Sequence, residues 1–226
     1  PQKMGDYKQR VFDHYPNIKP NIFALSDGII EAYSKVNVPK EKLFLTPNGL
    51  DNSEYRFVDK PKYPDRSICI GKIEDRKKQY FLQGIDSLWF AGNIADNRFN
   101  KNKNYLGELP KSKIKTDLTE YGNLVLVSDG EVHPRVCTEA LAAGLGVVIS
   151  ECGIANLDLD KEFITVIPDS KINDLEYIQT QTIRNRDFSI RNRHAIIDYA
   201  RQFDWSNIIE KYYLPSIQKV RSHYDS

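Results

Sequence analysis

Two glutamates, Glu131 and Glu139, stand with seven residues between them, one before and one inside an alanine-rich helical stretch. Each has an ordinary explanation alone: Glu131 as a carboxylate at the positive end of a helix, Glu139 as the partner of a nearby cation. Together, beside free helix N–H groups, they indicate hydroxyl binding. A carboxylate can accept two hydrogen bonds from a vicinal diol, and sugars offer such diols.

The elements around these carboxylates predict where they lie. Residues 123–129 have the pattern of a buried strand, and Pro134 fits the first turn of the helix that follows it. The next buried strand is predicted at the run VVIS, residues 147–150. The first N–H groups of the helix would therefore point beyond a strand end, where they can bind an anion.

A second candidate site is the basic turn GKIEDRKKQ, residues 71–79, which follows the predicted strand SICI. Gly71 allows a close backbone approach, and the cations Lys72 and Lys77 at a strand-to-helix turn could bind a diphosphate. The turn matches neither a full GxGxxG nor a Walker A pattern. From this segment alone, a diphosphate site and a solvated basic loop both stay open.

Composition excludes several classes. The 226 residues are 40% apolar and 28% charged, as in ordinary globular proteins, and the net charge of +1 does not suit a nucleic-acid binder. We expect no membrane span and at most peripheral membrane association, since no apolar run approaches about 18 residues. The three cysteines form no CxxC pair, which favours reduced thiols in a cytoplasmic protein.

No metal site is predicted. The sequence contains no DxD motif near the glutamates and no His or Cys cluster with ligand spacing. Asp158 and Asp160 form the triplet DLD, but it lies well past the glutamates, and we expect a solvated turn there.

Short apolar strands alternate with helical segments between Ser67 and Asp169, which is typical of a parallel, doubly wound α/β sheet. We count five or six strands in this region, one of them at residues 104–109. Ligands of such sheets bind at the carboxyl ends of the strands, where both candidate sites are predicted to lie. The fold class expected is α/β with a Rossmann-like parallel sheet.

The stretch EVHPRVCTEALAAG, residues 131–144, resembles the E-x7-E motif of the group 1 (family 4-like) retaining glycosyltransferases of GT-B fold. The turn CIGKIEDRK is similar to the phosphate loop of that family, with Lys72 at the position of its arginine and Lys77 at that of its lysine. Three more stretches are similar to parts of that family. Residues 22–51 are similar to its inter-domain passage, and residues 105–131 to the segment that leads into its site strand. Residues 203–217 are similar to its terminal aromatic helix. The resemblance covers nearly the whole chain and implies the C-terminal half of a GT-B enzyme.

The resemblance implies roles for the matched residues. Lys72 and Lys77 would neutralise the departing nucleotide diphosphate beside the backbone of Gly71. Glu131 would bind hydroxyls of the donor sugar and, with the two lysines, take part in catalysis, whereas Glu139 would accept hydrogen bonds from the ribose diol. The other expected binding residues lie around the start of the helix and are His133, Pro134, Arg135 and Val136. The nucleotide sugar would be a substrate, and no cofactor is expected.

The resemblance also implies a domain layout. Residues 1–40 would be the trailing strand and helix of an N-terminal acceptor domain, and residues 41–66 a linker. Residues 67–200 would bind the nucleotide sugar, and residues 201–226 would form a crossing helix. The chain opens on Pro1, which suggests a fragment without the acceptor domain.

Three functions stay open. In the first, the chain supplies the donor-binding domain of a glycosyltransferase that moves a sugar from a nucleotide donor such as a UDP- or GDP-sugar to a glycan or other hydroxyl acceptor. Alternatively, it binds a nucleotide sugar without turnover by itself, or it is a nucleotide-sugar epimerase of GT-B fold.

Overall fold

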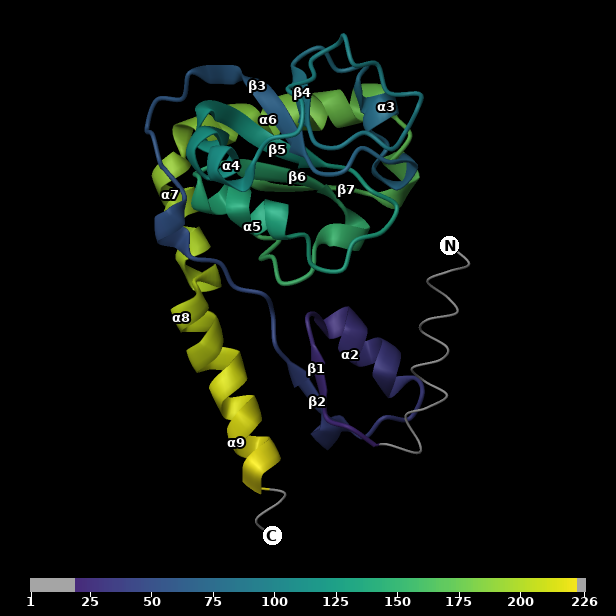
Figure 1. Ribbon diagram of the computed structural model, residues 1–226, viewed down its shortest axis with the longest axis vertical. Helices are drawn as coiled ribbons and strands as arrows, with labels where there is room; N and C mark the ends of the chain where they lie inside the picture. The colour runs from purple at the N-terminus through teal and green to yellow at the C-terminus, as the bar shows by residue number, and fades with distance from the viewer. Residues whose placement is uncertain (1–18, 223–226) are drawn as a thin grey trace. The chain divides into compact units, whose positions relative to one another are not determined.

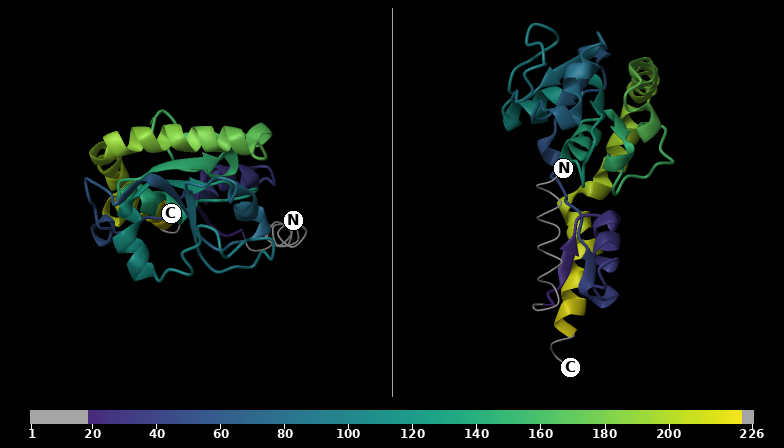
Figure 2. Two further views of the ribbon diagram at one scale, coloured as in Figure 1. Left: turned by 90° about the horizontal axis from the view of Figure 1, so that it is seen from above. Right: turned by 90° about the vertical axis from the view of Figure 1, so that its right-hand side faces the viewer.

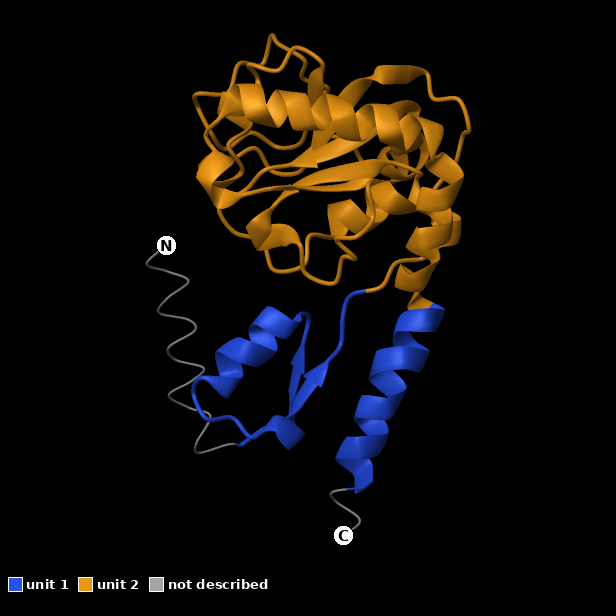
Figure 3. Ribbon diagram, turned by 180° about the vertical axis from the view of Figure 1, so that it is seen from behind, with its two compact units in different colours: residues 1–48, 206–226 blue, residues 49–205 orange. Residues whose placement is uncertain are grey.

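The computed structural model describes residues 19–222 (Figure 1). The chain forms two compact units, shown in separate colours in Figure 3. Unit 1 comprises residues 1–48 and 206–226, and unit 2 comprises residues 49–205. Both candidate sites lie in unit 2.

Unit 2 is built on a five-stranded sheet in which every strand pairing is parallel. The strands, in spatial order, are β4 (Leu88–Ala91), β3 (Tyr63–Ile70), β5 (Tyr121–Leu126), β6 (Gly146–Ser150) and β7 (Ile164–Ile167). Central strand β5 is buried along its whole length. The predicted α/β class with a Rossmann-like parallel sheet is confirmed.

Alternate side chains of the strands fill two separate cores, one on each face of the sheet. Leu124 and Leu126 of β5 enter the core that also holds the buried face of α5 (Arg135–Ala142). Val125, between them, enters the opposite core together with Ile178 of α6 (Leu175–Arg191). Figure 2 shows α6 as a layer lying along the sheet. The sheet is therefore covered on both faces, as its continuous apolar strands require.

Four shorter helices complete the connections of unit 2. They are α3 (Gln79–Leu82), α4 (Lys111–Asp117), α7 (Arg193–Ala200) and the start of α8 (Trp205–Ile208). Helix α3 follows a single 3₁₀ turn (Asp75–Lys77) and is only four residues long.

The fully buried Arg193 anchors the segment that leads into the sheet. Its guanidinium donates to the carbonyl oxygens of Val58, Thr119, Tyr121 and Ala143, and also to the Thr119 hydroxyl. Burial lowers the pKa of Arg193 to about 10. These bonds hold residues before β3 against the start of β5 and the end of α5.

Unit 1 contains a two-stranded parallel sheet of β1 (Ile22–Ala24) and β2 (Leu43–Leu45), connected through α2 (Asp27–Ser34). Its C-terminal part continues from α8 through a π-helical segment (Ile209–Tyr213) into α9 (Leu214–Ser222). Phe23 and Phe44 stack with their ring centroids 5.4 Å apart. The Tyr213 hydroxyl donates to the carbonyl of Thr46 over 3.4 Å, which joins the C-terminal helical segment to the strand end.

Two sequence expectations differ from the structure. The strand expected at residues 104–109 is absent, and Tyr105 makes an isolated bridge to Phe90 instead. Gly107 has a φ of +82°, which interrupts an extended ladder. The first strand of the large sheet begins at Tyr63, inside the segment expected to be a linker.

Candidate functional site

The carboxyl ends of β3 and β4 meet through two glycines. Gly71 donates its N–H to the carbonyl of Ala91 over 2.9 Å, and Gly92 has a φ of +147°. A Cβ on Gly92 would overlap the carbonyl oxygen of Gly71. Gly71 has a φ of +143°, and a Cβ there would lie 2.9 Å from the Nζ of Lys77. The backbones at the ends of β3 and β4 are thus packed as closely as glycine allows, and the ammonium group of Lys77 lies beside Gly71.

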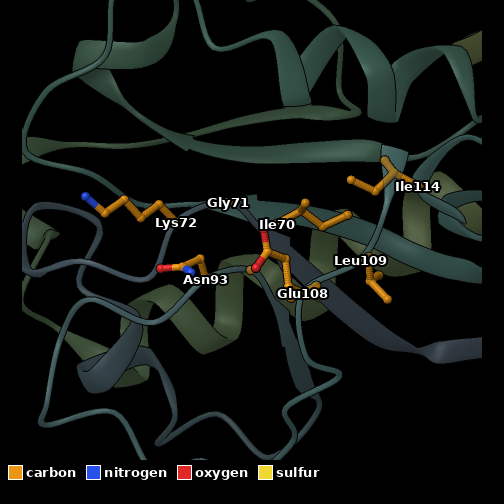
Figure 4. A pocket seen from close by; sticks show the side chains of 9 residues that line it. Ile70, Gly71, Lys72, Asn93, Glu108, Leu109 and Ile114 are labelled. Atoms are coloured by element: carbon orange, nitrogen blue, oxygen red, sulfur yellow. The ribbon is translucent and has the colours of Figure 1, made fainter. Parts of the chain in front are cut away.

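The two lysines of the basic turn lie in different environments. The Lys77 side chain is 14% exposed, and its Nζ lies 3.8 Å from Oε1 of Glu131. The Lys72 side chain is 59% exposed and extends away from Gly71, as Figure 4 shows, with its Nζ 3.7 Å from Glu74. Electrostatic interactions strengthen as water is excluded, so Lys77 is the stronger candidate to hold an anion.

Glu131 follows β5 in the turn before α5, and its side chain is 13% exposed. Oε1 accepts a hydrogen bond of 3.0 Å from Nη1 of Arg76. The structure thus brings Glu131, Lys77 and Gly71 together, as the sequence predicts from two separate segments. Arg76 adds a cation that the sequence did not single out for this contact.

The turn itself is fixed by small polar side chains. The carbonyl oxygen of Ser128 accepts from Oγ of Ser150 over 2.8 Å and from Sγ of Cys152 over 3.0 Å. The N–H of Asp129 donates to the carbonyl of Arg76 over 2.9 Å. These bonds join the end of β5 to the neighbouring strand β6 and to the basic turn.

Glu139 lies one turn further along α5 with its side chain 14% exposed. Its Oε1 lies 4.0 Å from Nη2 of Arg135, and its charge acts on the phenol of Tyr55. Burial, followed by the charge of Glu139, raises the pKa of the Tyr55 phenol above its ordinary value. Tyr55 comes from a polar stretch before β3, in which no site was predicted.

The start of α5 has the geometry of an anion site. Pro134 is the N-cap residue and Arg135 the first helical residue, so the free N–H groups of the first turn open toward the end of β5. The side chain of Arg135 is exposed and that of Val136 half-buried. His133 is buried, and both burial and the charge of Arg135 lower its pKa, which favours neutral imidazole.

A cavity of about 300 Å³ opens beside Gly71 (Figure 4). Lys72 and Asn93 lie on one side of it, and Glu108, Leu109 and Ile114 on the other. Glu108 and Leu109 come from the stretch that was expected to be a strand, and Ile114 comes from α4. The cavity was not predicted from the sequence. A second cavity of about 370 Å³ lies elsewhere, between Thr165 of β7 and the side chains of α6 from Arg184 to Arg191.

Cys69 and Cys137 are buried free thiols, and Cys152 is half-buried. Burial raises the pKa of Cys69 to about 12 and that of Cys137 further, so both stay protonated.

Asp158 caps its own turn by accepting from the N–H of Asp160 over 3.1 Å. Within residues 19–222, no three His, Cys, Asp or Glu side chains are grouped for a metal ion, and no helix is long and apolar enough to cross a membrane.

No protein-family model and no curated protein sequence matches this chain. Solved glycosyltransferase structures, however, match its fold. The lipopolysaccharide outer core galactosyltransferase WaaB aligns with 86% of this chain at 12% identity and a TM-score of 0.67. Anabaena HepE in complex with UDP aligns with 89% at 15% identity and a TM-score of 0.68. The pneumococcal O-GlcNAc transferase GtfA, in complex with UDP and GlcNAc, aligns with 95% at 16% identity and a TM-score of 0.69.

The chain has the fold of the GT-B glycosyltransferases. It spans 60% of the WaaB chain, 63% of the HepE chain and 48% of the GtfA chain. The match therefore corresponds to part of each of these structures, and at such low identity it concerns the fold.

Proposed function

We propose that this chain is the donor-binding half of a retaining glycosyltransferase, which transfers a sugar from a nucleotide sugar to a glycan or other hydroxyl acceptor. One observation carries the proposal: Glu131 and Lys77, whose side chains are 13% and 14% exposed, meet above the glycine-packed ends of two parallel strands, next to a cavity and a helix start. Structures of the same fold contain UDP, which supports a nucleotide-diphosphate ligand.

The arrangement of these residues suggests one orientation for a bound nucleotide sugar. The diphosphate would lie between Lys77 and the first N–H groups of α5, with Lys72 as an outer cation. Glu139 would accept hydrogen bonds from the ribose diol, and Glu131 from hydroxyls of the sugar. The cavity of about 300 Å³ is of the size expected for part of a small ligand and would take the base.

Catalysis by these residues would act on the leaving group. When the bond from the sugar to the diphosphate breaks, negative charge grows on the phosphate oxygens. Lys77 is 14% exposed and already positioned, so its attraction for that charge increases toward the transition state without reorganisation. We propose that this charge is balanced by side chains and helix N–H groups without a metal ion.

A second candidate is a nucleotide-sugar-binding module that is inactive alone. It is favoured by the extent of the match, since the chain spans 48–63% of the three structures described above. A hydroxyl acceptor would then bind only when a further domain is present. Both candidates require the same donor site, so donor binding is the first property to test.

Calorimetric titration with UDP, GDP and ADP, and with their sugar conjugates, tests donor binding. We expect one nucleoside diphosphate to bind in the micromolar to millimolar range, with affinity unchanged by a metal chelator. The absence of binding by all of them at millimolar concentration would contradict the proposed function. A large loss of affinity in chelator would reveal a metal site.

A further inference from the structure

Arg76 lies at the centre of a network that spans both candidate segments. Its Nη1 donates to Oε1 of Glu131 over 3.0 Å, to Oγ of Ser128 over 3.0 Å and to the carbonyl oxygen of Gly130. Its Nη2 donates to Glu74 over 2.9 Å. One planar guanidinium therefore holds the turn after β5 through Nη1 and an acid of the basic turn through Nη2, whereas an ammonium group would have to make these contacts from a single nitrogen.

Arg76 and Lys77 contact the same oxygen of Glu131 at different distances. The guanidinium is at hydrogen-bond distance, whereas the Nζ of Lys77 is 3.8 Å from the same oxygen. Arg76 is the more exposed of the two, at 40% against 14%. The half-buried ammonium of Lys77 is therefore the cation left available to a ligand, because Glu131 has a closer partner.

The contacts of Glu131 also orient its carboxylate. Both cations meet Oε1, and Oε2 makes no hydrogen bond or ion pair with the described residues. The charge of Oε1 is balanced by the protein, so Oε2 keeps its lone pairs for a ligand hydroxyl. Without the guanidinium, the carboxylate would be free to rotate, and Oε2 would no longer be held in one orientation toward a ligand hydroxyl.

We infer that Arg76 is a positioning residue, which holds Glu131 in the orientation that binds the donor sugar. This inference rests on the proposed function and deepens it. It assigns sugar recognition to a pair, Arg76 with Glu131, rather than to Glu131 alone. Arg76 acts through Glu131 and does not itself contact the ligand.

The test compares a nucleotide sugar with its free nucleoside diphosphate. Arg76→Gln should weaken the nucleotide sugar about tenfold while changing affinity for the free diphosphate by less than about twofold, because the lost interaction is a charged hydrogen bond to the sugar-binding residue. Arg76→Lys should recover part of the loss, since it keeps the charge but not the fork. Melting curves check that each variant is folded.

A double-mutant cycle with Glu131→Gln identifies the route of the effect. In the Glu131→Gln background, Arg76→Gln should cause no further loss of nucleotide-sugar affinity. Arg98→Gln is the matched control, because Arg98 pairs with Asp75 of the same turn and with Asp96 but is not a partner of Glu131. This control should leave the ratio of the two affinities unchanged.

Two outcomes would overturn the inference and leave the proposed function standing. One is an equal loss of affinity for both ligands in Arg76→Gln, which would mean that Arg76 contacts the diphosphate directly. The other is additivity with Glu131→Gln, which would show that Arg76 acts independently of it. If the wild-type protein bound neither ligand, the proposed function would fail and this inference with it.

Discussion

Gly92→Ala should lower the free energy of unfolding by roughly 3 kcal/mol or more, and should abolish nucleotide binding in whatever protein remains folded. Two penalties combine at this position. The φ of +147° is one that side chains rarely adopt, and the new Cβ would overlap the carbonyl oxygen of Gly71. The second penalty cannot be relieved by a rotamer change, because the overlapping atom belongs to the backbone. Urea unfolding measures the first effect, and calorimetry the second.

Two other glycines separate these penalties. Gly107 has a φ of +82° but nothing within 4 Å of an added Cβ, so Gly107→Ala should cost only the conformational strain, about 1 kcal/mol. At Gly130 an added Cβ would have nothing within 4 Å, and the backbone φ is not unusual. Gly130→Ala should therefore change the free energy of unfolding by less than about 0.5 kcal/mol. If Gly92→Ala were no worse than Gly107→Ala, the close contact between β3 and β4 would not be a constraint on this site.

Glu139→Gln should weaken binding of the free nucleoside diphosphate about tenfold to a hundredfold. The reason is the loss of a charged hydrogen bond to the ribose, worth roughly 1.5–3 kcal/mol. The same substitution should leave the 2′,3′-dideoxy analogue almost unaffected, because that ligand has no diol to bind. Calorimetry with both ligands measures the difference. An equal loss for the two would mean that Glu139 maintains the fold, for instance through Tyr55, and does not bind ribose.

Glu131→Gln is the companion variant and should show the opposite preference. It should leave the free diphosphate nearly unchanged and weaken the nucleotide sugar, because Glu131 is expected to bind the sugar. The four affinities of two variants and two ligands together locate the two ends of the donor. If Glu131→Gln reduced affinity for the free diphosphate as strongly as for the sugar form, the sugar would not lie at the start of α5.

The parallel sheet and the position of the two candidate segments at one edge of it could be predicted from sequence, for one physical reason. Buried strands of a parallel sheet need continuous apolar runs, and their carboxyl ends lie on one edge. Gly71 and Glu131 each follow such a run, so both were expected at that edge, and the pairing of β3 with β5 makes them neighbours there. The ligand roles assigned to them remain predictions.

Contacts made by long side chains could not be predicted in this way. Residues 74–78 are all charged, and nothing in their order tells which side chain turns toward Glu131. Arg76 does so because the 3₁₀ turn at Asp75–Lys77 places it beside the end of β5. Tyr55 reaches Glu139 through the path of residues 49–62, which depends on the buried Arg193 far along the chain.

The most direct test of the central claim is to locate the bound nucleoside diphosphate by amide chemical-shift mapping. Isotope-labelled protein is titrated with the nucleotide that binds best. We expect the largest shifts on Gly71, Lys77 and Arg135, at the carboxyl edge of β3 and β5. Shifts gathered instead around the second cavity, from Thr165 to Arg191, with none at Gly71 or Arg135, would contradict it.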